Sequence, residues 1–182
     1  MNHPAPADVQ PSAGAQHAVF LAAAIVGTIA DLFSKYLVFP AGMYGNPFLA
    51  PHTEVIPGIF AIQCSWNSGA LFGIGQRMNP LFVALSAVAI FIVPLLHLRL
   101  ARSNGLLHAF GLGAIEAGAL GNLYDRLHYG RVRDFLDFHW GRHYWPTFNI
   151  ADALLCAGLA ALFLCSLKRT GGEGVSTPSD KS

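Results

Sequence analysis

Four stretches of about twenty mostly apolar residues constrain the fold of this chain more than any other feature. They cover residues 17–39, 80–99, 106–124 and 149–167. A helix needs about 20 consecutive apolar residues to cross the hydrocarbon core of a bilayer, so each stretch is long enough to span a membrane. Charged residues make up only 12% of the chain, roughly half of their share in soluble domains. The sequence therefore predicts an all-α membrane protein with four spans.

Small residues at four-residue spacing predict how the spans pack. The third and fourth spans each carry one such ridge, formed by Gly113, Ala117 and Gly121 and by Ala153, Ala157 and Ala161. Small side chains let helix backbones approach closely within lipid. We therefore expect a compact four-helix bundle.

The segments outside the spans are expected to differ in structure. Residues 1–16 are rich in Pro, Ala and polar residues, which predicts a disordered tail before a four-span domain over 17–167. Residues 168–182 form a second, polar tail. The connections 40–79 and 125–148 are long and lie on one side of the membrane. Within the first of them, "GIFAIQCSW" has aromatic and β-branched residues between turn formers, so we expect strands of a small sheet at the membrane surface.

Charge and cysteine content argue against several classes of function. A net charge of +1 provides no electrostatic basis for binding nucleic acid. The three cysteines form neither a paired framework nor a CxxC motif, so their spacing does not indicate disulfides or a zinc site. Basic residues divide evenly between the two sides of the membrane, so the rule that cytoplasmic loops are more basic does not fix the orientation. One side carries Arg99, Arg102, Lys168, Arg169 and Lys181, and the other carries Arg77, Arg126, Arg131, Arg133 and Arg142.

Polar and charged residues gather at one end of the predicted bundle. Ionisable groups within spans are costly to insert, which makes each of them a candidate functional residue. The first and third spans end where the fourth begins, so polar residues at these points are expected at one membrane face. They are Asp31, Lys35, Asn122, Asp125, Arg126, Asp134, Asn149 and Asp152. A layer of acids, amides and bases at one depth indicates a site.

Several of these residues also have a purely structural interpretation. Asp31 and Lys35 are spaced i, i+4, as in an ion pair on one helix face. Asn149 and Asp152 have the N-cap and N3 spacing of a helix start, where an acid also suits the helix dipole. Asn67 lies two residues before a glycine, which is typical of a turn.

A pair of acids in this layer has the chemistry of an aspartic hydrolase. Close carboxylates in a poorly solvated place cannot both ionise easily, so one keeps a proton. The charged acid removes a proton from water, and the neutral acid donates a hydrogen bond to the carbonyl oxygen. A proton or ion pathway is the alternative, but it would spread polar groups through the bilayer, where only Glu116 and His108 are expected. A third possibility is a structural subunit of a larger complex, in which the acids would be replaceable.

Five short blocks make the chain resemble a known family. "DLFSK", "NSGALFG", "GALGNLYDR", "VRDF" and "FNIAD" follow one another as in lipoprotein signal peptidase (signal peptidase II), a bacterial membrane aspartic protease. The resemblance extends over residues 17–167. It implies an endopeptidase that removes the signal peptide of a prolipoprotein before a cysteine carrying diacylglycerol, with no metal or cofactor. The expected partners are this substrate and membrane lipids, and we expect a monomer that binds no nucleic acid.

The resemblance also implies roles for individual residues. Asp134 and Asp152 would be the catalytic pair, and Asp125, although a rival acid, would be a supporting residue. The other positions that would line the pocket or support the site are Asn67, Asn122, Arg126, Asn149, Asp31 and Lys35. Both termini would be cytoplasmic, and the active site with its extracytoplasmic sheet and loops would lie at the outer face of the inner membrane.

Three residues stand out against the family pattern. Ala117 stands where relatives often have Gly, Arg133 replaces an aliphatic residue beside Asp134, and Glu116 is unexpected in mid-span. We expect the positive charges of Arg131 and Arg133 to lower the pKa of Asp134.

Overall fold

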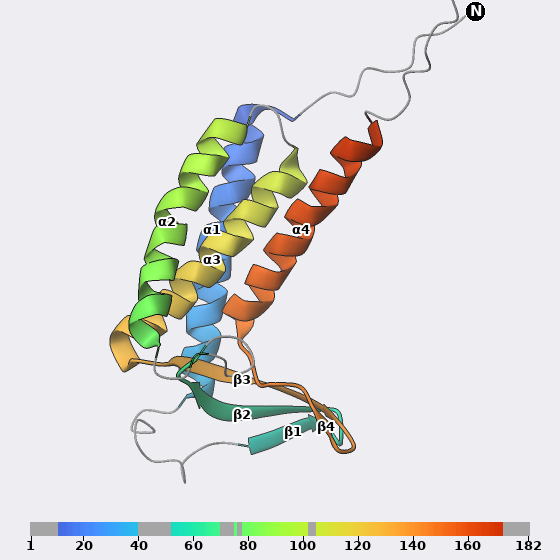
Figure 1. The fold of residues 1–182 in the computed structure, drawn as a ribbon. Coiled ribbons are helices and arrows are strands. Elements are labelled where there is room, and N and C mark those ends of the chain that lie inside the picture. Colours follow the sequence, from blue (N-terminus) through green and yellow to red (C-terminus); the bar gives the residue numbers. More distant parts are fainter. Residues whose placement is uncertain (1–10, 40–51, 70–74, 76–77, 102–104, 173–182) are drawn as a thin grey trace, which may run out of the picture.

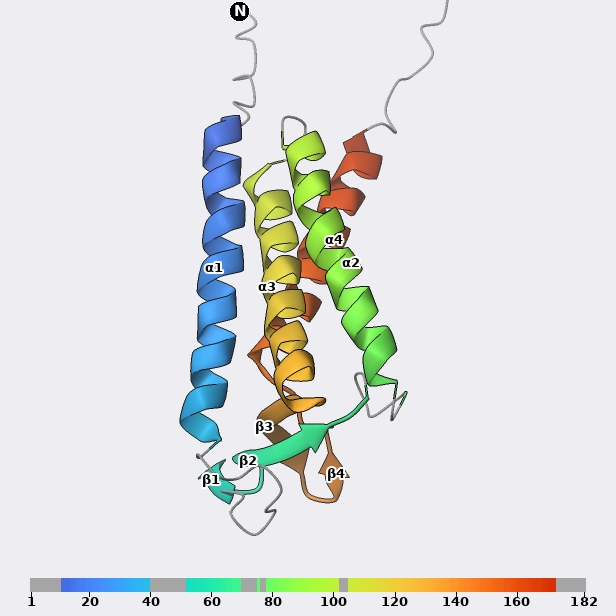
Figure 2. The ribbon, with the colours of Figure 1, turned by 90° about the vertical axis from the view of Figure 1, so that its left-hand side faces the viewer.

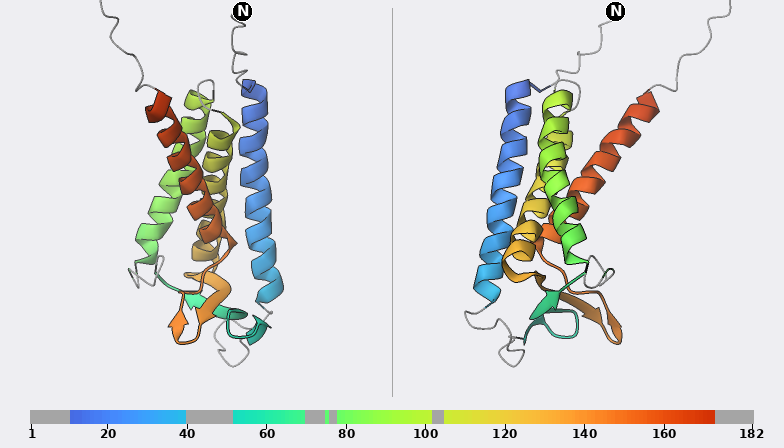
Figure 3. Two further views of the ribbon diagram at one scale, coloured as in Figure 1. Left: turned by 90° about the vertical axis from the view of Figure 1, so that its right-hand side faces the viewer. Right: turned by 60° about the vertical axis from the view of Figure 1, so that its left-hand side comes forward.

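Four long helices and a small sheet make up the computed structural model, which describes residues 11–39, 52–69, 75, 78–101 and 105–172. The helices are α1 (Ala13–Val38), α2 (Asn79–Leu100), α3 (Leu106–Tyr129) and α4 (Ile150–Gly172). All four are long and apolar enough to cross a membrane, which confirms the prediction of four spans. They run side by side with the sheet at one end of the bundle (Figure 1). α1 begins and α4 ends at the opposite end (Figure 3).

Three helices extend beyond their predicted limits by several residues, and α2 by one residue at each end. α1 begins at Ala13, inside the expected tail, because Ser12 caps it: the Ala15 backbone N–H donates to Ser12 Oγ at 3.2 Å. α3 continues past residue 124 to Tyr129 and ends at Gly130, whose φ of 71° suits glycine. Its polar end stays helical because neighbouring elements supply partners for the polar side chains. α4 continues to Gly172, and the remaining tail residues 1–10 and 173–182 lie outside the described part of the chain.

α3 is the central helix and packs against α1, α2 and α4 (Figure 2). Its predicted ridge of small residues faces α1, since a Cβ added to Gly113 would lie 2.5 Å from the carbonyl oxygen of Phe20. Ala117 is fully buried on the same ridge. A Cβ added to Gly27 of α1 would lie 2.7 Å from the Cβ of Ala117, so Gly27 leaves the space that this alanine occupies.

The prediction of a packing ridge on α4 is wrong. Ala153 and Ala157 are exposed, and Ala161 is the one member of that ridge that is buried. α4 instead meets α3 at Gly158, where an added Cβ would lie 2.6 Å from the carbonyl oxygen of Gly111. Ala161 faces α3 beside Gly158, since a Cβ added to Gly111 would lie 3.2 Å from the Cβ of Ala161. Small residues at this contact permit the close approach of the two helices.

An antiparallel sheet with the strand order β1-β2-β3-β4 lies below the helices. Its strands are β1 (His52–Ile56), β2 (Phe60–Asn67), β3 (Val132–Trp140) and β4 (His143–Tyr144). β2 confirms the strand expected in "GIFAIQCSW", whereas β3 lies in a connection for which no strand was predicted. Polar residues at Arg133, Asp134 and Asp137 interrupt the apolar alternation that marks a strand. β3 forms nonetheless because β2 pairs with it, with Ser65 opposite Asp134.

β3 turns consecutive side chains to opposite faces of the sheet. Asp134 points toward the start of α4, where it meets Asn149. Arg133 and Phe135 point the other way, and Phe135 packs with Phe39 in an apolar cluster. The strand therefore presents one acid to the helix ends and anchors itself with the residues on either side.

Candidate active site

Nine polar residues form one connected network at the sheet end of the bundle. They come from α1, β2, α3, β3 and the start of α4, and hydrogen bonds or ion pairs link each of them to at least one other. They are Asp31, Lys35, Asn67, Asn122, Asp125, Arg126, Asp134, Asn149 and Asp152. The structure thus brings together every residue that the sequence singled out as a site residue.

Asp134 and Asp152 are joined through two asparagine side chains. Asn149 Nδ2 lies 2.6 Å from Asp134 Oδ1 and 3.2 Å from Asn122 Oδ1, and donates to both. Asn122 Nδ2 in turn donates to Asp152 Oδ1 at 2.8 Å. On its other oxygen, Asp134 accepts a hydrogen bond from Asn67 Nδ2 at 3.0 Å. The two carboxylates therefore belong to a single hydrogen-bonded unit.

The two acids differ in their environments. Asp134 is 2% exposed, whereas Asp152 is half-buried. The pKa of Asp134 is raised to about 7, chiefly by burial and then by the nearby charge of Asp152; hydrogen bonds from Asn67 and Asn149 and the charge of Lys35 partly oppose this increase. Asp134 can therefore retain a proton near neutral pH.

The expectation that Arg131 and Arg133 lower the pKa of Asp134 is wrong. Arg131 lies over the ring of Trp66, 5.2 Å from its centroid. Arg133 points to the opposite face of β3 and binds Asp125. Adjacent residues of a strand do not share a face, so these charges do not offset the burial of Asp134.

The start of α4 is held by two side chains. Asn149 Oδ1 accepts a hydrogen bond from the backbone N–H of Asp152 at 2.9 Å, so the N-cap interpretation of Asn149 is correct. Asp31 Oδ1 accepts one from the backbone N–H of Ala151, also at 2.9 Å. Because these caps serve the helix end, the carboxylate of Asp152 remains available to face Asn122.

The carboxylate of Asp125 forms ion pairs with two cations. Lys35 Nζ lies 2.7 Å from Asp31 Oδ2 and 3.1 Å from Asp125 Oδ2, and all three side chains are fully buried. Arg133 Nη2 lies 2.7 Å from Asp125 Oδ1. This geometry suits a supporting residue and does not suit an acid that must meet water and substrate.

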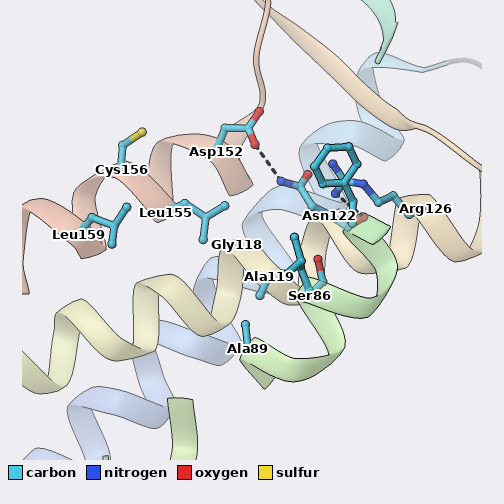
Figure 4. Close-up of a pocket in the computed structure, with 12 residues that line it drawn as sticks. Ser86, Ala89, Gly118, Ala119, Asn122, Arg126, Asp152, Leu155, Cys156 and Leu159 are labelled. Carbon is cyan, nitrogen blue, oxygen red and sulfur yellow. Dashed lines mark hydrogen bonds between the residues drawn. The ribbon is translucent and has the colours of Figure 1, made fainter. Parts of the chain in front are cut away.

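Two largely apolar cavities lie beside Asp152. One of about 350 Å³ lies between α2, α3 and α4, and Figure 4 shows Asn122, Arg126 and Asp152 at one end of it. The other, of about 430 Å³, lies between α4 and the segment around β3 and β4. Asp152 and Cys156 line both cavities. An extended apolar ligand could therefore pass the acid pair with lipid-like surroundings on either side.

Comparison with known proteins shows the family to which this chain belongs. A family model described as signal peptidase (SPase) II matches residues 23–168. The chain belongs to the signal peptidase II family. It is similar to the lipoprotein signal peptidase of Symbiobacterium thermophilum, at 39% identity over 141 residues that cover 78% of this chain and 89% of the relative. The enzyme of Ralstonia nicotianae is 36% identical over 163 residues, covering 86% and 89%.

The fold of this signal peptidase is similar to that of a solved structure. A bacterial membrane enzyme determined by the in meso method at 2.3 Å resolution aligns with a TM-score of 0.75 and 26% identity, covering 91% of this chain and 95% of that chain. Together with the four spans, these findings make the chain a multi-pass membrane peptidase.

This signal peptidase also contains site features that the sequence interpretation missed. Phe138, Trp145 and Phe148 line the second cavity, and Cys156 lies one helical turn after Asp152. The spacing of Cys156 from Asp152 was a usable signal, whereas the aromatic residues carry none without the strand pairing. In the part of the chain that the structure describes, no three His, Cys, Asp or Glu side chains are grouped as a metal site would require.

Proposed function

We propose that this signal peptidase removes the signal peptide from bacterial prolipoproteins, before a cysteine carrying diacylglycerol, with Asp134 and Asp152 as its catalytic pair. The main support is the linkage of the two carboxylates through Asn149 and Asn122, beside two apolar cavities. The family relationship supports the choice of substrate.

The two acids divide the chemistry according to their environments. Asp152, which borders the cavities, removes a proton from water, and the water oxygen attacks the carbonyl carbon of the scissile peptide bond. Asp134 gives its proton to the carbonyl oxygen, which produces a neutral tetrahedral diol. When the C–N bond breaks, Asp152 returns its proton to the leaving amine and Asp134 regains one from the diol. Neither a metal nor a cofactor takes part in this proposed mechanism.

The cavity between α2, α3 and α4 offers a place for an apolar signal helix. Leu85, Ala89 and Leu155 line it with apolar surface, and Asp152 borders it. Arg126 reaches the same region, donates to the carbonyl oxygen of Gly69 at 3.2 Å, and interacts electrostatically with both acids. We infer that Arg126 and the asparagines hold the substrate backbone while its acyl chains remain in lipid.

The proposal includes an orientation in the bacterial inner membrane. Both termini would be cytoplasmic, and the sheet and acid pair would lie at the outer face. The peptidase would reside in residues 17–167, act as a monomer on prolipoproteins and membrane lipids, and bind no nucleic acid. The arrangement that supports this is the clustering of polar groups at the sheet end, opposite the start of α1 and the end of α4.

A proton pathway fits the distribution of polar groups less well. Glu116 is buried near the middle of α3, but His108 lies in its first turn and not deep in the bundle as expected. The acids and amides gather at one end instead of following a path through the bilayer.

A cleavage assay tests the proposed function. Purified protein should cut a diacylglyceryl-modified precursor and leave the unlipidated precursor largely intact. Asp134→Asn, brought to the same membrane abundance, should not cut either one. Equal cleavage of both precursors would contradict the proposed substrate, and an active Asp134→Asn variant would contradict the mechanism.

A further inference from the structure

Arg133 completes a buried charge cluster behind the acid pair. The cluster consists of Asp31 and Lys35 of α1, Asp125 of α3 and Arg133 of β3. The first three are 0% exposed and Arg133 is 6% exposed. Two carboxylates face two cations, so the formal charges cancel. Buried charges are tolerated when they are paired in this way.

Arg133 donates most of the hydrogen bonds that the carboxylate of Asp125 accepts. Its Oδ1 accepts from Arg133 Nε at 3.0 Å and Nη2 at 2.7 Å, and its Oδ2 accepts from the Arg133 backbone N–H at 3.0 Å. The other donor is Lys35, at 3.1 Å. The guanidinium also lies over Tyr129, 4.8 Å from its ring centroid. An aliphatic residue at position 133 could supply only the backbone contact.

Arg133 is connected to both acids of the pair. Its backbone leads directly into Asp134, so the bond to Asp125 fixes β3 against the end of α3 at the point where Asp134 is presented. Through Lys35, it is also connected to Asn122: Lys35 Nζ lies 3.4 Å from Asn122 Oδ1. Asn122 then donates to Asp152.

We propose that Arg133 is a positioning residue for peptide cleavage: by neutralising Asp125, it keeps Lys35 at Asn122 and sets the charge balance behind the acid pair. This inference rests on the proposed function. A residue with only a structural role would affect folding, but it would not alter how the reaction responds to pH.

The charge balance leads to a specific pH dependence. Without Arg133, the buried carboxylate of Asp125 draws Lys35 away from Asn122, and Lys35 is the cation whose charge lowers the pKa of Asp134. The acid pair therefore keeps its proton to higher pH. Removing the negative charge of Asp125 has the opposite effect. The cations that face the pair from the packed elements are Lys35 of α1 and Arg126 of α3. Behind Lys35 lie the other charged groups of the cluster, which are Asp31, Asp125 and Arg133.

The test is the pH profile of cleavage by purified, folded variants. Arg133→Met should move the alkaline limb upward by roughly half a pH unit, and Asp125→Asn should move it downward by a similar amount. Combining the two should return the limb toward the wild-type position. Arg133→Lys keeps the charge, so it is the matched control and should leave the limb in place.

The outcomes separate this inference from the proposed function. If Arg133→Met does not accumulate, the downward shift of Asp125→Asn and its reversal in the double variant still decide the question. Suppose that the folded variants keep the alkaline limb of the wild-type pH profile, while wild type is active and Asp134→Asn is inactive. This result would overturn the role of Arg133 and leave the proposed function standing. A wild type that does not cleave the lipidated precursor, or an active Asp134→Asn, would overturn the proposed function instead.

Discussion

The side chain of Asn149 both donates a hydrogen bond to Asp134 and caps α4. Its Nδ2 donates to Asp134 Oδ1 at 2.6 Å, and its Oδ1 accepts from the backbone N–H of Asp152 at 2.9 Å. The helix cap and the acid pair are therefore parts of one arrangement. The structural and catalytic interpretations of Asp152 do not compete, because the cap uses its backbone and the pair uses its carboxylate.

The acid pair leads to the first prediction. Asp134→Asn and Asp152→Asn preserve side-chain size but remove a carboxyl group that transfers protons. Each should lower turnover of a diacylglyceryl-modified precursor by at least about 10²-fold, the lower end of the usual contribution of general acid–base catalysis. The double variant should be scarcely slower than either single variant, since the two acids act as a unit.

Asp137→Asn is the matched control for the acid pair. Asp137 is equally buried on β3, but it lies on the face opposite Asp134. This variant should keep most of the wild-type turnover once its abundance is matched. Near wild-type cleavage by Asp134→Asn, together with an inactive Asp125→Asn, would transfer the catalytic role to Asp125.

The raised pKa of Asp134 predicts how stability depends on pH. Its value is about 7 in the folded protein, against 3.8 for an ordinary aspartate, so the folded state binds more protons between these pH values. The resulting stabilisation is complete below the lower value and is lost as pH rises through about 7. Thermal unfolding in detergent should therefore show a decline across this window that Asp134→Asn lacks. Parallel curves for the two proteins would show that Asp134 does not titrate there.

The spans and the polar layer could be predicted because local features of the sequence determine them. Long apolar runs fix the spans, and the place of each polar residue relative to a span end fixes its depth. β3 could not be predicted, since its pairing depends on β2, which is distant in sequence. The partner of Arg133 was missed for the same reason: Asp125 becomes its neighbour only when β3 docks at the end of α3.

His97 illustrates a similar limit. This histidine is 2% exposed within the bundle. Its Nε2 lies 2.8 Å from Nδ1 of His17, and its ring stacks on Phe20. A single histidine in an apolar run carries no sign of a partner on another helix.

The ion pair of Asp31 and Lys35 predicts an effect on folding. Lys35→Met leaves the buried carboxylates of Asp31 and Asp125 short of a cation, and breaking such a pair typically costs about 3–5 kcal/mol. The amount of folded protein in the membrane should fall. Adding Asp31→Asn should restore part of it, but not all, because a neutral amide oxygen is a weaker acceptor than the Asp31 carboxylate for the backbone N–H of Ala151. A double variant worse than either single one would contradict the pairing.

Membrane orientation can be tested with engineered cysteines. Cys64 is a poor reporter because its thiol contacts the carbonyl oxygen of Val38 at 3.3 Å and burial raises its pKa to about 11. Arg142→Cys, in the exposed turn after β3, and Lys168→Cys, near the end of α4, should replace it in a cysteine-free background. A membrane-impermeant maleimide should label the first in intact spheroplasts and the second only after permeabilisation. The reverse pattern would invert the proposed topology.

The two cavities beside Asp152 predict that bulk at Cys156 blocks the substrate. Cys156 is exposed, follows Asp152 by one helical turn and lines both cavities, so Cys156→Trp should fill space without disturbing the helix contacts. We expect kcat/KM to fall by about 10-fold or more, because small displacements of a reacting bond are costly. Cys165→Trp, farther along α4 and outside both cavity linings, is the matched control and should cleave normally. In wild type, a lipid-soluble thiol reagent should modify Cys156 more slowly when lipidated precursor is present. Equal rates of modification, or full activity of Cys156→Trp, would mean that the substrate approaches the acid pair by another route.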